Sequence, residues 1–240
     1  MATRQDRPSV IMGFPQSSHR YSAGSGIAFV GLLIASILVF GLDIPTYDDS
    51  GRVFAAYYAD NSSKIELSIL IGGFSAIALM WFVGFMRWVY WGAETAARGF
   101  VRATDIGYAA AIAGIALSVV TIAAQEAAVV ATGTVEPGVI RALDLFGDYA
   151  FVLAGLFLSI WLLSSFFVIR VTKVFHDWLA VLALVGTVLG VVQSVLLLAP
   201  QDDDGVLGLL GIVFVVVMMV WVLATSVTLV RRVEAIQRTG

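Results

Sequence analysis

The chain has 240 residues and a formal net charge of −3, and 60% of its residues are apolar while only 13% are charged. About a quarter of the residues of an ordinary soluble domain are charged, so this composition excludes such a fold and indicates an integral membrane protein. The acidic balance argues against nucleic acid as a partner. The absence of cysteine excludes disulfides, thiolate metal sites and cysteine nucleophiles.

Apolar runs long enough to cross about 30 Å of hydrocarbon occur six times along the chain. They lie at residues 22–42, 65–89, 106–130, 145–169, 178–198 and 206–230. Because lipid offers no hydrogen-bonding partner to the backbone, each span is expected to be a helix. The predicted fold is all-α, a polytopic membrane protein whose six transmembrane helices form one bundle over residues 22–230.

The two ends of the chain are polar. Residues 1–21 contain Pro8, Pro15, Ser17 and Ser18 and are expected to form a disordered cytoplasmic arm. Residues 231–240 are expected to form a basic cytoplasmic tail. The first apolar run follows the polar arm and lacks a small-residue cleavage site, so we interpret it as a span and not as a signal peptide.

Lysine and arginine are divided unequally between the two sides of the predicted membrane domain. Three of them lie on the side away from the termini: Arg52, Lys64 and Arg141. The other eleven lie on the side of the termini: Arg4, Arg7, Arg20, Arg87, Arg98, Arg102, Arg170, Lys173, Arg231, Arg232 and Arg238. This excess predicts a multi-pass protein of the bacterial inner (plasma) membrane with both termini in the cytoplasm. The opposite, outer side is rich in acidic residues.

The longest segment between two spans, Asp43 to Lys64, is expected to carry a short helix on the outer membrane surface. Candidate N-caps come first and an apolar helical face follows: Asp48, Asp49 and Ser50, then Val53, Phe54, Tyr57 and Tyr58. The polar run Asn61-Ser62-Ser63 is expected to end this helix. The helix would be either a packed lid or headgroup-level anchor, or a lid that gates a ligand.

Aromatic residues gather at the predicted inner boundaries, where an aromatic belt is expected. They are Trp88, Tyr90, Trp91, Tyr108 and Trp178. Trp161 and Trp221 instead fall in the middle of spans, and we expect both to fill the core of the bundle.

Small residues recur at three- and four-residue spacing in the third, fourth and fifth spans. Helices in lipid associate through close backbone contact, so such residues indicate packing faces. The glycines expected there are Gly114, Gly155, Gly186 and Gly190. The motif Gly186-x-x-x-Gly190 would either hold the bundle together or form the seam of a homodimer.

Known catalytic and cofactor patterns are missing from the sequence. His19 and His176 lie outside the spans, which excludes a haem held by histidines of two helices. Lys64 and Lys173 lie at the membrane edges, which excludes a buried retinal-type Schiff base. No metalloprotease, nucleophile-elbow or phosphate-loop motif occurs. We therefore expect neither an enzyme nor a bound cofactor or metal ion. The Asp202-Asp203-Asp204 run is interpreted as a solvated turn, with a weak calcium site as the alternative.

Polar side chains near the outer ends of three spans form the one candidate site. They are Gln125, Glu126, Asp148 and Gln193. At about 1.5 Å per residue they would sit roughly 5 to 8 Å below the outer surface and could share one layer. Ionisable groups at such depth usually face the bundle interior or a wet cavity, which would make a cation, proton or polar-ligand site. In the alternative, Asp144 and Asp148 stand in the first turn of a helix, reach water directly and have Arg141 as a partner.

Three segments carry a resemblance to a known group of proteins. They are Arg52-Val53-Phe54-Ala55-Ala56-Tyr57-Tyr58, Trp81-Phe82-Val83-Gly84-Phe85 and Trp178-Leu179-Ala180-Val181-Leu182-Ala183-Leu184-Val185-Gly186. In this order they resemble bacterial six-helix membrane proteins grouped as a domain of unknown function. The resemblance implies a six-span bundle and brings no catalytic residue with it.

The sequence thus favours a non-enzymatic interaction or accessory subunit. Its expected partners are membrane lipids and a further protein or a second copy of the chain. The alternative is a small transporter or channel with an outward-facing site built on Glu126 and Asp148. A third hypothesis, an intramembrane enzyme acting on lipid, would need paired acid and base groups near the headgroups.

Overall fold

The computed structural model describes residues 16–41, 44–46, 48–97, 102–196 and 204–239. This part of the chain is all-helical, and its six helices are each long and apolar enough to cross a membrane. They are α1 (Gln16–Phe40), α2 (Gly51–Ala96), α3 (Ala103–Ala131), α4 (Pro137–Thr172), α5 (Asp177–Leu196) and α6 (Asp204–Thr239). The expected six-helix bundle is confirmed, and the protein is a multi-pass membrane protein.

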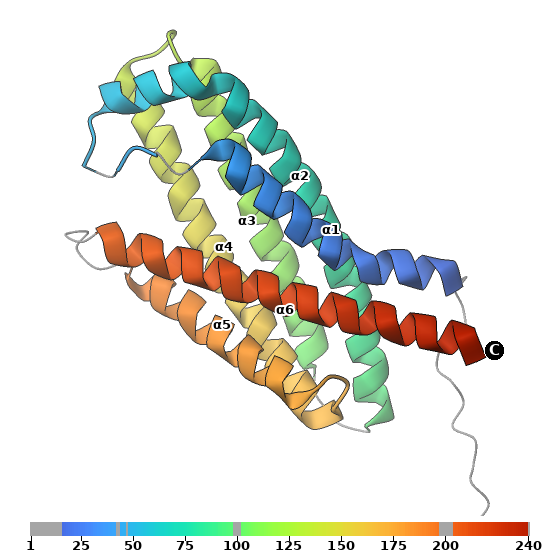
Figure 1. Cartoon of the computed structure of the whole chain (residues 1–240). Coiled ribbons are helices and arrows are strands. Elements are labelled where there is room, and N and C mark those ends of the chain that lie inside the picture. The colour runs from blue at the N-terminus through green and yellow to red at the C-terminus, as the bar shows by residue number, and fades with distance from the viewer. Residues whose placement is uncertain (1–15, 42–43, 47, 98–101, 197–203, 240) are drawn as a thin grey trace, which may run out of the picture.

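Consecutive helices run in opposite directions and pack side by side, and α6 returns to pack against α1, as Figure 1 shows. The start of α1 and the end of α6 therefore lie at the same end of the bundle. We call this the basic end, defined by Arg20, Arg87, Arg102, Arg170, Lys173, Arg231 and Arg232. The other is the acidic end, defined by Asp48, Asp49, Asp60, Glu66, Glu136 and Asp144.

Helix α2 is longer than the sequence predicted, with 46 residues. The segment before the second span is helical, but the helix does not end at Asn61-Ser62-Ser63 and continues without a break through the span. Phe54, Tyr58 and Ile65 are all buried on one face in a common apolar cluster, so a helix end in between would interrupt that face. Asparagine and serine cost a helix up to about 0.7 kcal/mol each relative to alanine, which burial outweighs.

The first part of α2, cyan in Figure 1, crosses the end of the bundle before the helix bends into the span. Within this region the Asn61 side-chain amide donates to the Tyr57 carbonyl oxygen at 3.0 Å. Such a contact competes with the backbone hydrogen bonds of the helix and favours a bend. The segment thus lies over the acidic end although it belongs to a spanning helix.

The centre of the bundle is filled by large apolar side chains. Trp161 of α4 and Trp221 of α6 are both buried and meet edge to face, with ring centroids 5.2 Å apart. The Trp221 indole N–H donates to the Leu179 carbonyl oxygen at 3.0 Å, which satisfies its polar group. The expectation that both tryptophans fill the core is confirmed.

The ends of the chain differ in part from the expectation. Helix α1 begins at Gln16, so residues 16–21 of the expected disordered arm are helical, while residues 1–15 lie outside the described residues. The expected tail is helical as far as Thr239, because α6 continues through it. The calcium alternative at Asp202-Asp203-Asp204 also lies outside the described residues, except for Asp204 at the start of α6.

Glycines let α3 and α5 approach α4 closely. A Cβ atom on Gly114 of α3 would lie 2.9 Å from the Leu158 side chain of α4, and one on Gly186 of α5 would lie 2.6 Å from Leu162. A Cβ atom on Gly190 would come within 2.0 Å of Ser159 Oγ. The small-residue faces of α3 and α5 are therefore both turned toward α4, which is the central helix of this half of the bundle.

Candidate polar site at the acidic end

A tyrosine and a carboxylate from distant parts of the chain meet at the acidic end. Tyr58 Oη of α2 donates to Asp144 Oδ1 of α4 at 2.5 Å. Tyr58 is 0% exposed and Asp144 8% exposed, so the pair is shielded from solvent. Tyr58 belongs to an apolar cluster at this end of the bundle, together with Phe54, Ile65, Ala128, Val129 and Ile140. A hydrogen bond to a charged group in such surroundings is stronger than one made in water.

The start of α2 is fixed against the start of α4 at a second point. A Cβ atom on Gly51 would lie 2.6 Å from the Pro137 carbonyl oxygen, so only glycine allows this approach. Pro137 itself lies in the first turn of α4, where its missing N–H costs nothing. Together, Gly51 and Tyr58 hold the crossing segment of α2 against α4.

Asp148 extends the polar site by one turn of α4. It is half-buried and lies one turn beyond Asp144 on the same helix. Arg141 lies one turn before Asp144 on the same helix and is itself engaged in interactions. The arrangement can hold a proton between the tyrosine and a carboxylate or offer carboxylate oxygens to a cation. The described residues contain no group of three or more His, Cys, Asp or Glu side chains that could hold a metal ion.

Helix α4 begins earlier than the sequence predicted, and this corrects one interpretation of its acidic residues. Because the helix starts at Pro137, Asp144 and Asp148 lie about two and three turns after its start and not in the first turn. The helix dipole acts mainly within the first turn, so it does not explain these carboxylates. The Tyr58 hydroxyl, which the sequence analysis placed only on an apolar face, is the partner that stabilises Asp144.

The four residues proposed from the sequence do not form one layer. Gln125 and Glu126 are half-buried on α3, and no hydrogen bond or ion pair joins Glu126 to the described residues. Gln193 is buried between two glycines. A Cβ atom on Gly211 would lie 2.8 Å from Gln193 Nε2, and one on Gly155 would lie 3.8 Å from Gln193 Oε1. Gly155 follows Asp148 by seven residues of α4, about 10 Å along the helix axis. Gln193 therefore lies deeper than Asp148, in space that two glycines leave between α4 and α6.

A groove of about 710 Å³ lies beside this site at the acidic end. One wall is formed by the end of α1 together with Gly41, Ile44 and Pro45. The other is the crossing segment of α2, which contributes Val53, Ala56, Tyr57 and Asn61. Asp60 and Lys64, one helical turn apart, add opposite charges to a mostly apolar lining. The sequence analysis did not find this groove, because it depends on how the end of α1 lies against α2.

Comparison with known protein families, with curated proteins and with solved structures gave no match. The resemblance to bacterial six-helix membrane proteins therefore stays a prediction. The function has to be inferred from the geometry of the chain itself.

Proposed function

We propose that this multi-pass membrane protein is a non-enzymatic accessory or interaction subunit of the bacterial inner membrane that binds a protein partner at its acidic end. The distribution of lysine and arginine supports an orientation with both termini and the basic end in the cytoplasm, which leaves the acidic end facing outward. Membrane lipids surround the apolar helix faces.

The groove at the acidic end is the observation that carries this proposal. Its volume of about 710 Å³ and its mostly apolar lining suit an inserted side chain or short segment of a partner. The α2 wall is held in place by the contact between Gly51 and Pro137 and by the hydrogen bond between Tyr58 and Asp144. A preformed surface binds more tightly than a flexible one, because less conformational entropy is lost on binding.

Site-specific photo-crosslinking in native membranes tests the proposal. A photoactivatable residue at Ala56, which lines the groove, should give a discrete adduct with a second polypeptide. The same residue at Ala59 is a matched control, because Ala59 is exposed on the same segment and does not line the groove. Adducts with lipid alone at Ala56, or equal adducts at both positions, would contradict a partner-binding groove.

A small transporter or channel is a second candidate, favoured by two carboxylates one turn apart on α4, one of which accepts a hydrogen bond from Tyr58. Asp144 and Asp148 give the acidic end a site that could take up a proton or a cation. The packed centre of the bundle, with Phe82, Leu162 and Trp221 fully buried, leaves any path closed in this conformation. Transport would therefore require a second conformation that opens toward the basic end.

Flux measurements in reconstituted vesicles separate the two candidates. If the protein transports protons or cations, Asp148→Asn should lower the coupled uptake by at least about tenfold, as expected for loss of a binding carboxylate. Glu126→Gln should change it little, because no hydrogen bond or ion pair joins Glu126 to the described residues of this site. Background flux for the wild type, with no difference among the three proteins, would eliminate transport and leave the accessory role.

A further inference from the structure

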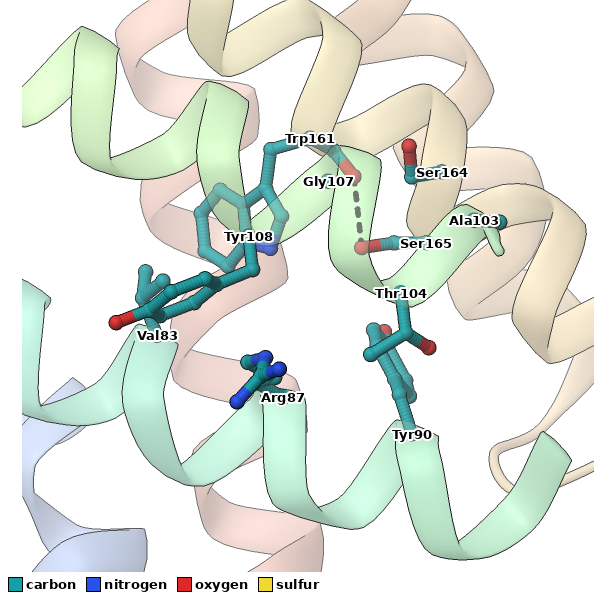
Figure 2. A pocket seen from close by; sticks show the side chains of 10 residues that line it. All are labelled: Val83, Arg87, Tyr90, Ala103, Thr104, Gly107, Tyr108, Trp161, Ser164 and Ser165. Atoms are coloured by element: carbon teal, nitrogen blue, oxygen red, sulfur yellow. Dashed lines mark hydrogen bonds between the residues drawn. The ribbon is translucent and has the colours of Figure 1, made fainter. Parts of the chain in front are cut away.

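A small pocket lies near the basic end, between α2, α3 and α4. Its volume is about 10 Å³, and its polar lining comes from Arg87 and Tyr90 of α2, Thr104 of α3, and Ser164 and Ser165 of α4. Figure 2 shows Tyr90 reaching from α2 toward Thr104 and Ser165. The pocket is separate from the polar site at the acidic end.

Tyr90 does not belong to the aromatic belt that the sequence predicted. Trp88, Trp91 and Trp178 are exposed at the basic end as a belt requires, whereas Tyr90 is only 3% exposed. It is turned into the bundle, and its ring meets the buried Phe175 edge to face at 6.2 Å. The hydroxyl of a buried tyrosine normally has a hydrogen-bond partner.

Two buried hydroxyl groups in this pocket have no hydrogen-bond partner among the described residues. They are Tyr90 Oη and Thr104 Oγ1, and Thr104 is 4% exposed. Ser165 also lines the pocket, but its hydroxyl proton is donated to the Trp161 carbonyl oxygen at 2.9 Å, so it is not available to Tyr90 Oη. Leaving a buried hydroxyl unpaired is unfavourable, so two such groups in one pocket indicate a shared hydrogen-bond partner.

The size of the pocket decides the class of that partner. A cavity needs at least about 10–15 Å³ of space for the centre of a water molecule to hold one water, so this pocket has room for about one. An anion is also disfavoured by charge, because the Arg87 guanidinium is already paired with Asp105 at 2.9 Å and lies over the Tyr108 ring at 5.0 Å. The groups left for a ligand are neutral hydroxyls, which can both donate and accept.

We propose that a single water molecule is bound in this pocket and bridges Tyr90 Oη of α2 and Thr104 Oγ1 of α3. A water molecule can donate to one hydroxyl and accept from the other, and buried waters typically make about three hydrogen bonds. Ser165, whose hydroxyl oxygen can still accept a hydrogen bond, offers the third. The water joins α2 to α3 where the two helices approach the basic end.

Removing either hydroxyl tests the proposal, because the melting temperature should fall if the water is bound and rise if it is not. With the water bound, Tyr90→Phe and Thr104→Val each delete one of its hydrogen bonds and should lower the melting temperature by about 2–4 °C. With dry, unpaired hydroxyls, the same substitutions would remove a buried polar group and raise it. Thr104→Ser keeps the hydroxyl and should melt closer to the wild type than Thr104→Val. Tyr149→Phe is a control, since Tyr149 is exposed on α4.

A density map of the full chain in lipid, at a resolution that shows ordered water, gives an independent readout. We expect a peak within hydrogen-bond distance of Tyr90 Oη and Thr104 Oγ1 in the wild type, and its weakening or loss in Tyr90→Phe. Absence of the peak in the wild type, or unchanged or raised melting temperatures in both variants, would overturn the proposal.

Discussion

A Gly190→Ala variant is expected to be destabilised by about 1–3 kcal/mol, the usual cost of adding a methyl group to a filled contact. The new Cβ atom would lie 2.0 Å from Ser159 Oγ and 2.9 Å from the Phe214 ring, so α4, α5 and α6 would have to move apart. Thermal unfolding in detergent or lipid nanodiscs measures the effect. Gly190→Ile should be more severe, because a branched side chain needs more of the same space.

Gly84→Ala is the matched control for this substitution. Gly84 also lies inside a helix, but no atom lies within 4 Å of the Cβ position there. Alanine is a better helix former than glycine by up to about 1 kcal/mol, so this variant should be as stable as the wild type or more stable. If Gly190→Ala and Gly84→Ala unfold alike, the close contact between α4 and α5 is wrong.

A double substitution tests whether Ser159 Oγ causes the loss of stability in Gly190→Ala. Ser159→Ala removes the Oγ atom that the new methyl group would meet, so Gly190→Ala should cost less in the Ser159→Ala background than in the wild type. The result also bears on the homodimer hypothesis. Gly186 and Gly190 contact α4 of the same chain, so the loss of stability should not depend on protein concentration.

Local spacing explains why this part of the fold could be predicted from the sequence. Small residues at three- and four-residue intervals share one helix face whatever lies opposite, so Gly114, Gly186 and Gly190 could be placed on packing faces without knowing their neighbours. The identity of the neighbours could not be predicted. Leu158, Leu162 and Ser159 face these glycines only because α4 lies between α3 and α5.

The candidate site was harder to predict, because its contacts join residues far apart in the chain. Tyr58 and Asp144 are separated by 86 positions, and nothing near Asp144 in the sequence indicates a tyrosine donor. The sequence predicted that Gln193 and Asp148 lie at the same depth below the outer membrane surface, because each depth was estimated from the number of residues to the expected end of its span. The true start of α4 at Pro137 and the glycines beside Gln193 place them about 10 Å apart along α4.

Tyr58→Phe is expected to lower the free energy of unfolding by about 1–3 kcal/mol, because it leaves the buried Asp144 carboxylate without its donor. Tyr58 is fully buried, so the ring of phenylalanine can keep the apolar contacts and the effect reports on the hydroxyl. Chemical or thermal unfolding of the reconstituted protein measures the change. Asp144→Asn should cost less, since an amide oxygen still accepts a hydrogen bond from the tyrosine.

The same variant should also loosen the first part of α2, and this local effect separates anchoring from general instability. Hydrogen exchange over residues 51–64 should become faster in Tyr58→Phe, while exchange in the remainder of α2 should stay close to that of the wild type. The double variant Tyr58→Phe/Asp144→Leu should be less destabilised than the two single effects together predict, because no buried polar group is left unpaired. Additive losses, or exchange that rises equally along the whole of α2, would mean that this hydrogen bond does not hold the wall of the groove. The crosslink at Ala56 would then need another explanation, because the proposed partner site depends on that wall being rigid.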